Sequence, residues 1–289
     1  MDSIREAIEK QVHQLIGFGS GEVDLDRPAG DLGLFGPASA AWRVHSDFTT
    51  MMIGGLSALL LQMLHPLVLA GVWDHSNFRG DMLGRLRRTA QFISGTTYGS
   101  TRQAQTLIDR VNAIHSHIHG QTPDGTAYSA RDPALLEWVH VTEVTSFLRA
   151  YIRYHDPWFA HAEQDRYLTE MARVARLLGA PAVPATRREI DAYVTRVRPD
   201  LRADDRTRVV ARALLGPRPA GISTLLFQSV TNKAAIDLLP GWAARMHGLP
   251  MRDPERLLVR GSAHGAAMVM RWALRDGSAR RARKRVGAG

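Results

Sequence analysis

The chain has 289 residues, of which 45% are hydrophobic and 22% are charged, a composition typical of a globular protein with a substantial core. Its formal net charge is +9 at neutral pH, and it contains no cysteine. The lack of cysteine excludes disulfides, iron–sulfur clusters, thiolate metal ligands and cysteine nucleophiles. The 12 histidines are therefore the richest remaining source of strong metal ligands.

The positive charge is concentrated at the carboxyl end. Residues 271–289 contain seven basic side chains and one acidic side chain, Asp276, so this segment supplies six of the nine charges. We predict that residues 276–289 form a disordered basic tail. Because the rest of the chain is near charge balance, we expect no nucleic acid partner.

The amino end predicts one helix and a loop. Apolar residues recur at helical spacing over 2–16, and residues 17–37 are rich in glycine, proline and aspartate. No apolar run precedes a small-residue cleavage site, so we predict no signal peptide and a cytoplasmic protein.

Helical patterns then follow one another closely, and most of them end at glycine or proline. The predicted helices cover residues 38–73, 80–94, 100–119, 132–155, 160–178, 186–197, 204–215, 218–239 and 254–275. Only residues 120–129 suit a short hairpin, which would turn at Asp124-Gly125. The sequence thus predicts an all-α protein with a single globular domain over 38–275, preceded by the helix and loop of 1–37.

One long segment raises the question of a membrane. Phe48 to Trp73 contains no charged residue over 26 positions, enough for a helix to cross a bilayer. Gln62, His65 and Pro66 lie within it, and polar groups are costly at the centre of a bilayer. We therefore predict a buried core helix kinked at Pro66, and contact with a membrane surface stays an open alternative.

The helix around His115 carries the first candidate ligand. His115 shares one face with Leu107, Val111 and Ile118. A histidine on an apolar face is more often a core residue than a ligand. No His-Glu-x-x-His pattern or third acidic ligand accompanies it, so the spacing does not favour a zinc site.

Two further helices carry polar side chains among apolar ones. Arg85, Arg88 and Thr89 form a strip on the helix over 80–94, and either a solvated edge or an anion site would account for it. On the helix over 132–155, His140 and Glu143 could make polar contacts within or between helices.

Taken together, these motifs resemble one family, the mpaB / rubber oxygenase (latex-clearing protein) catalytic domain. The resemblance covers roughly residues 30–240. No single motif is specific for the family, but the set of motifs in this order is fairly specific. The motifs in chain order are His65-Pro66, Ala70-Gly71-Val72, His75-Ser76, Phe78, Arg85-x-x-Arg88-Thr89, His115-x-x-Ile118-x-Gly120, Gly125-x-x-Tyr128 and Trp138-Val139-His140.

The resemblance implies a globin-like helical core that holds a non-covalent heme b. It implies that His115 is the iron ligand and that Arg85, Arg88 and Thr89 are the catalytic residues on the other side of the heme. The remaining cofactor-binding candidates are His65, His75 and His140.

Two departures from the rubber-cleaving branch bear on the substrate. That branch carries lysine where this chain has Arg88, and arginine stays protonated and does not readily bind iron. The glutamate that serves that branch as a base has no clear counterpart here. We therefore do not expect polyisoprene as the substrate.

The resulting hypothesis is a heme-dependent oxygenase that acts with O2 on a small apolar substrate. The alternatives are a non-catalytic protein that binds heme or O2, and a cofactor-free helical interaction protein at a membrane. A homodimer is also compatible with the many apolar helices.

Overall fold

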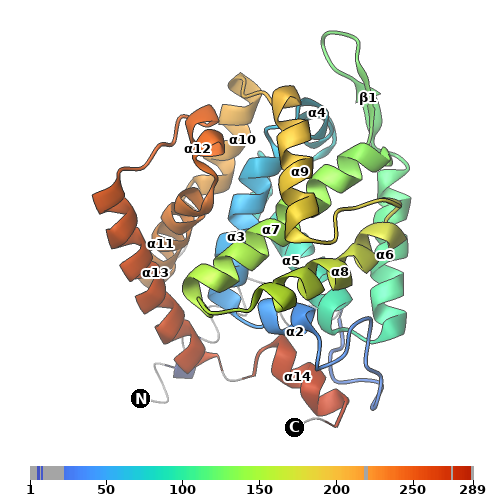
Figure 1. Cartoon of the computed structure of the whole chain (residues 1–289), viewed down its shortest axis with the longest axis vertical. Helices are drawn as coiled ribbons and strands as arrows, with labels where there is room; N and C mark the ends of the chain where they lie inside the picture. Colours follow the sequence, from blue (N-terminus) through green and yellow to red (C-terminus); the bar gives the residue numbers. More distant parts are fainter. Residues whose placement is uncertain (1–4, 7, 9–22, 218–220, 275, 288–289) are drawn as a thin grey trace.

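The computed structural model describes residues 5–6, 8, 23–217, 221–274 and 276–287, and these are mostly helical (Figure 1). The predicted all-α class is confirmed, and the globin-like detail stays a prediction. The helix expected over 2–16 lies largely outside the described residues. Within the described ranges, the strands form a single two-stranded hairpin.

The α-helices have the following bounds, with one 3-10 turn at Arg198–Asp200. They are α2 (Ala40–Val44), α3 (Phe48–Gln62), α4 (Pro66–His75), α5 (Met82–Tyr98), α6 (Thr101–His115), α7 (Pro133–Tyr154), α8 (His161–Leu177), α9 (Arg187–Val197), α10 (Asp205–Leu215), α11 (Ile222–Leu238), α12 (Gly241–Met246), α13 (Asp253–Ala273) and α14 (Ser278–Arg285).

Helices α3 and α7 cross in the centre of the molecule and form its core (Figure 1). Glycine is required where they meet, because a Cβ at Gly54 would lie 2.8 Å from Phe147 Cδ1 and 3.0 Å from the Ser146 carbonyl oxygen. Helix α3 is mostly apolar and 11 of its 15 residues are buried, as expected for a core helix.

The single helix predicted over 38–73 is wrong, because the chain forms α2, α3 and α4 there. The Asp47 side chain accepts a hydrogen bond from Thr50 N–H at 2.8 Å and starts α3 afresh. Pro66, in the first turn of α4, has no N–H that could continue the backbone hydrogen bonds of α3. The axes of α3 and α4 differ by 105°. Over the described ranges, we find no single helix with both the length and the apolarity to cross a bilayer.

The hairpin predicted over 120–129 is confirmed as β1 (His119–Gln121) and β2 (Ala127–Ser129), with Gly120 opposite Tyr128. Gly125 has φ +85°, which glycine adopts without strain. Tyr128 anchors the hairpin to α4 by donating its hydroxyl to Asp74 Oδ2 at 2.6 Å.

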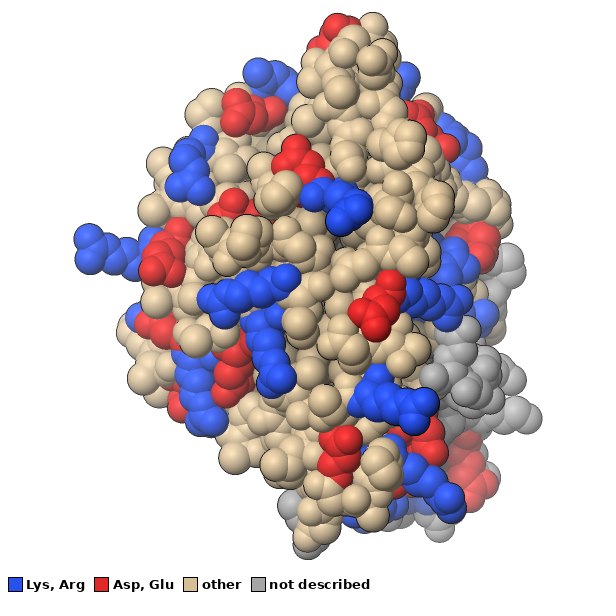
Figure 2. All heavy atoms as spheres, turned by 90° about the vertical axis from the view of Figure 1, so that its right-hand side faces the viewer, with Lys and Arg blue, Asp and Glu red and all other residues tan. Residues whose placement is uncertain are grey.

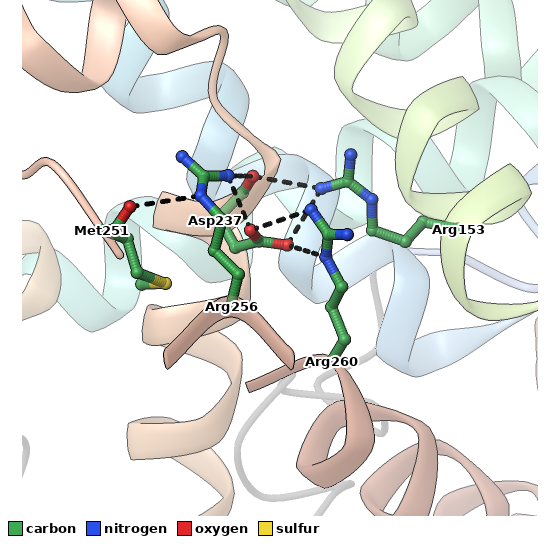
Figure 3. Close-up of polar contacts among 5 residues, drawn as sticks. All are labelled: Arg153, Asp237, Met251, Arg256 and Arg260. Carbon is green, nitrogen blue, oxygen red and sulfur yellow. Dashed lines mark hydrogen bonds and ion pairs between the residues drawn. The ribbon is translucent and has the colours of Figure 1, made fainter. Parts of the chain in front are cut away.

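A buried carboxylate joins three helices on one side of the core (Figure 3). The side chain of Asp237 on α11 is 0% exposed and is surrounded by Arg153 of α7 and by Arg256 and Arg260 of α13. The ion-pair distances are 3.0, 2.8 and 2.8 Å in that order. Arg153 and Arg256 also donate to the Asp237 backbone carbonyl.

The structure differs from the predicted disordered tail. Helix α14 lies against the body of the protein, and Arg285 is only 3% exposed. Its guanidinium donates to the carbonyl oxygens of Asp31 and Leu25, each at 3.0 Å, and of Gly99 at 3.3 Å. The tail folds because these three carbonyl oxygens accept hydrogen bonds from a guanidinium group that composition alone predicted to be exposed to solvent.

Candidate functional site

The predicted arginine strip lies on α5, with its two arginines in different surroundings. Arg85 is half-buried and donates through Nη1 to Ser76 Oγ at 2.9 Å, while Thr89 Oγ1 donates to the Arg85 carbonyl at 3.1 Å. Burial, helped by the charge of Arg88, lowers the pKa of Arg85 from its usual value. Arg88 is exposed and pairs with Asp81 Oδ2 at 3.3 Å.

His115 is the last residue of α6 and has an unpartnered ring nitrogen. The residue is half-buried, and its Nδ1 atom is buried with no hydrogen-bond partner. Burial lowers the pKa of His115, so the imidazole is neutral at neutral pH, which is the form that binds metal. His115 therefore fits the role of a single protein ligand.

Two other candidate histidines share these properties. His65, before the first turn of α4, has an unpartnered buried Nδ1, and its ring centroid lies 6.3 Å from that of Trp138. His140 on α7 has an unpartnered buried Nε2, and burial lowers its pKa to about 4. Unpartnered buried polar atoms are costly, and a bound group is one way in which that cost is offset.

His75 differs from these three. It is exposed, and its Nε2 lies 3.2 Å from the His119 carbonyl oxygen and 3.2 Å from the Tyr128 hydroxyl. These contacts hold the hairpin against α4, which gives His75 a structural role in addition to the predicted one.

The structure connects only some of the seven candidates. The backbone carbonyl of Arg85 accepts a hydrogen bond from Thr89, and the charge of Arg88 lowers the pKa of Arg85. Within the part of the chain that the structure describes, no hydrogen bond or ring contact links His115 to the other six. The described residues also contain no group of three or more histidine, aspartate or glutamate side chains that could hold a metal ion.

A cavity of about 640 Å³ lies beside α5, the helix that carries the arginine strip. Side chains of α3, α5, α7, α13 and α14 form most of its walls. Most of the lining is apolar, and its main apolar members are Met51, Met52, Leu56, Leu59, Leu86, Ala90, Ile93, Phe147, Met270 and Leu274. Thr89 is the one predicted site residue in this wall.

The charged groups at the cavity are paired with each other. Arg271 Nε lies 2.6 Å from Asp47 Oδ2 and its Nη2 donates to the Tyr154 carbonyl at 2.7 Å, while His155 Nδ1 lies 3.6 Å from the same carboxylate. Burial raises the pKa of Asp47, but hydrogen bonds from His155, Thr50 and Arg271 outweigh it and lower the pKa overall. The cavity thus offers no uncompensated charge to a ligand at this cluster.

His45 also lines the cavity, but both its ring nitrogens are engaged. They lie 2.8 Å from Thr97 Oγ1 and 2.8 Å from the Tyr167 hydroxyl. Full burial lowers the pKa of His45 to about 3, so it is a neutral hydrogen-bonded core residue. Neither nitrogen is free to bind a metal.

This cavity could not be predicted from the sequence, because its lining comes from segments far apart in the chain, near residues 45–59, 86–98, 147–155 and 270–281. One local signal was available. Asp47 directly precedes the uncharged segment that begins at Phe48, the position that a helix cap occupies.

Glu143 lies on α7, one helical turn after His140. The side chain is half-buried, and among the described residues no hydrogen bond or ion pair reaches its carboxylate, unlike the contacts predicted from the sequence. Burial raises the pKa of Glu143 from 4.5 to about 7. Its carboxyl group is therefore partly protonated at neutral pH.

We expect Glu143→Gln to flatten the pH dependence of stability. The folded chain holds this proton more tightly than the unfolded chain, so ionisation removes folding free energy as the pH rises from 4.5 to about 7. Chemical denaturation from pH 5 to 8 should show the variant gaining stability relative to the parent as the pH rises. Parallel curves for the two proteins would contradict a raised pKa at this position.

The outer face that includes the hairpin and α6 carries mixed charge. Basic and acidic side chains alternate there between wide uncharged areas, and they do not merge into one basic surface (Figure 2).

Comparison with known protein families matches residues 42–272 to the family described as ER-bound oxygenase mpaB/B'/Rubber oxygenase, catalytic domain. The match spans about four-fifths of the chain and includes all seven predicted site residues. No curated protein and no solved structure matches the chain.

Proposed function

Because the chain belongs to the family of mpaB and rubber oxygenase catalytic domains, we propose that it is a heme b-dependent oxygenase that acts with O2 on an apolar organic substrate. The family supports oxygenase activity. The heme is what the resemblance to that family implies, and the substrate class is our inference from the residues of this chain.

One observation carries the proposal. Thr89 belongs to the Arg85-x-x-Arg88-Thr89 motif and also lies in the wall of the apolar cavity. A single helix, α5, therefore presents charged donors and an apolar compartment within one turn of each other. An oxygenase for apolar substrates needs both, one for the oxygen chemistry and one for the substrate.

The residues present fit a heme. His115 would hold its iron, because a neutral imidazole with an unpartnered buried nitrogen is what iron ligation requires. When bound, the heme supplies the iron at which O2 is activated.

The chain's own residues supply positioning and electrostatics. Arg85 is held by Ser76 and is only half-exposed, so its donors are better oriented and less screened by water than those of a surface arginine. Arg88 adds a second positive charge, because its guanidinium group stays protonated. Thr89 links the pair to the cavity through its hydrogen bond to the Arg85 carbonyl.

The cavity favours a neutral substrate. Its volume of about 640 Å³ is in the range that holds small organic molecules, and its walls are mostly aliphatic, methionine and phenylalanine side chains. The Asp47–Arg271 pair is already compensated, so a charged substrate would enter without a partner there.

An absorption spectrum of the purified protein, supplied with hemin and assayed as the pyridine hemochrome, tests the proposal. We expect a Soret band with about one heme per chain, and oxidised product when O2, a reductant and an apolar alkene are added. A flat Soret region would refute the heme assignment, and a heme spectrum without product would favour a non-catalytic binding protein.

Filling the cavity should weaken substrate binding without disturbing the fold. Gly55 lines the cavity, and a Cβ added there meets only Phe147 Cε1 at 3.7 Å, an ordinary contact. Leucine at this position would displace about two methylene-sized groups of a ligand, which at ~0.8 kcal/mol each is about a tenfold loss of affinity. Binding of a fluorescent apolar probe measures this loss.

Gly55→Ala is the matched control, because it adds one methyl group to the same helix position. We expect it to bind the probe nearly as well as the parent and to unfold at a slightly higher temperature, since alanine favours the helix. Equal probe affinity in the leucine variant and the parent would place the substrate elsewhere.

A further inference from the structure

Helix α13 leaves a large apolar surface uncovered. Five of its large apolar side chains are exposed, namely Leu257 (70%), Leu258 (73%), Met268 (64%), Val269 (47%) and Trp272 (42%). Leu225 and Leu226 of the adjacent helix α11 are exposed as well. These two helices lie together at one edge of the molecule (Figure 1). Monomeric proteins rarely leave such a continuous apolar surface in water.

The exposed side chains share one face of α13, and two glycines lie at its centre. Helical spacing places Gly261 and Gly265 between the pair Leu257–Leu258 and the pair Met268–Val269. A Cβ added at either glycine would meet no atom of the described residues within 4 Å, so no contact among those residues requires glycine there. Glycine inside a helix costs stability, and close approach of another backbone is a physical reason to keep it.

The order of residues along this face is symmetric about the level of position 263, where the side chain of Ala263 itself points inward and is buried. Glycines stand two positions before and after it, at 261 and 265. Large apolar residues stand five and six positions away in both directions, at 257, 258, 268 and 269. The outer positions, nine residues away, hold Pro254 and Trp272. Because residues of the same kind occur at equal distances in both directions, this face is complementary to an antiparallel copy of itself.

We propose that α13 is the homodimer interface of this protein, with two copies of the helix packed antiparallel about a two-fold axis at Ala263. Gly261 of one copy then lies against Gly265 of the other, and the two backbones approach closely. Leu257 and Leu258 form a layer with Met268 and Val269 of the second copy, and the same layer recurs on the other side of the axis.

The helix dipoles favour the same arrangement. In an antiparallel pair the amino end of each copy of α13 lies beside the carboxyl end of the other, so the two dipoles oppose each other. A parallel pair would bring the two positive ends together and the two negative ends together.

Light scattering after size exclusion tests the interface. We expect the parent chain to elute with twice the mass of a single chain at micromolar concentration. Gly265→Leu should elute as a monomer, because a side chain at the centre blocks the approach of the backbones, and it should keep its helical circular dichroism since its site is open in the monomer. Ala162→Leu, at an exposed position on α8, is the matched control and should remain dimeric.

Disulfide trapping tests the antiparallel register, and the chain has no cysteine of its own to interfere. An equal mixture of Gly261→Cys and Gly265→Cys chains should give a cross-linked pair on mild oxidation, whereas each variant alone should give little. Cross-linking of each variant with itself would indicate a parallel pair and overturn the proposal. A monomeric parent chain would also overturn it, and binding of that monomer to phospholipid vesicles would assign the face to a membrane.

Discussion

Replacing His115 with alanine is expected to abolish stoichiometric heme binding, lowering heme occupancy by more than about tenfold at micromolar hemin. The reason is that His115 combines a neutral imidazole with an unpartnered ring nitrogen, and no cluster of other ligands among the described residues could replace it. Titration with hemin, followed at the Soret band, measures the loss. Circular dichroism should show an intact fold, because His115 is only half-buried at the end of α6.

His155→Ala is the matched control. His155 lies beside the apolar cavity, and its Nδ1 is near the Asp47 carboxylate, so it is the histidine best placed to bind iron if the heme occupied the cavity. We expect this variant to bind heme like the parent. If instead His155→Ala lost heme while His115→Ala kept it, the cofactor would belong in the cavity and the assignment of His115 would be wrong.

Asp237→Asn is expected to destabilise the protein by about 3–5 kcal/mol. The substitution keeps the shape of the side chain but removes the negative charge on which Arg153, Arg256 and Arg260 converge (Figure 3). The three guanidinium groups, each 22–37% exposed, would then repel one another without a counter-charge. Differential scanning calorimetry should show a midpoint lower by roughly 5–8 °C for a chain of this size.

The exposed ion pair between Asp205 and Arg208 provides the comparison. The Asp205 side chain is 97% exposed, so Asp205→Asn should change the stability by less than about 1 kcal/mol. A similar small effect at Asp237 would mean that α7, α11 and α13 are held together by apolar packing alone. The contrast between the two variants separates a buried charge cluster from ordinary surface pairing.

Local signals in the sequence predicted much of the helical architecture. The hairpin followed from Asp124-Gly125, where a residue with positive φ is required, and α7 followed from Asp132-Pro133, where the aspartate caps the helix and proline takes its first turn. The break between α3 and α4 was harder to predict. Proline can either kink a helix or begin a new one, and the 105° bend depends on what α4 packs against.

The family motifs identified the arginine strip and His115, but they gave no indication of the cavity. Arg85, Thr89 and His115 could be named because they lie in short motifs. The cavity could not, because its wall combines Met51 of α3, Phe147 of α7 and Met270 of α13, which have no sequence relation to one another. Likewise, the raised pKa of Glu143 results from burial that only the packed helices create.

The sequence by itself determined the all-α class, most helix ends and the family, because caps, turn residues and motifs act over a few neighbouring positions. Only the tertiary structure decided where the cavity lies, which carboxylate gathers three arginines and that the basic tail packs onto the body as α14. These features depend on burial and on contacts between residues up to 260 positions apart, as between Arg285 and Leu25. Such contacts form only when the chain has folded, since the free energy of burying a side chain depends on what surrounds it.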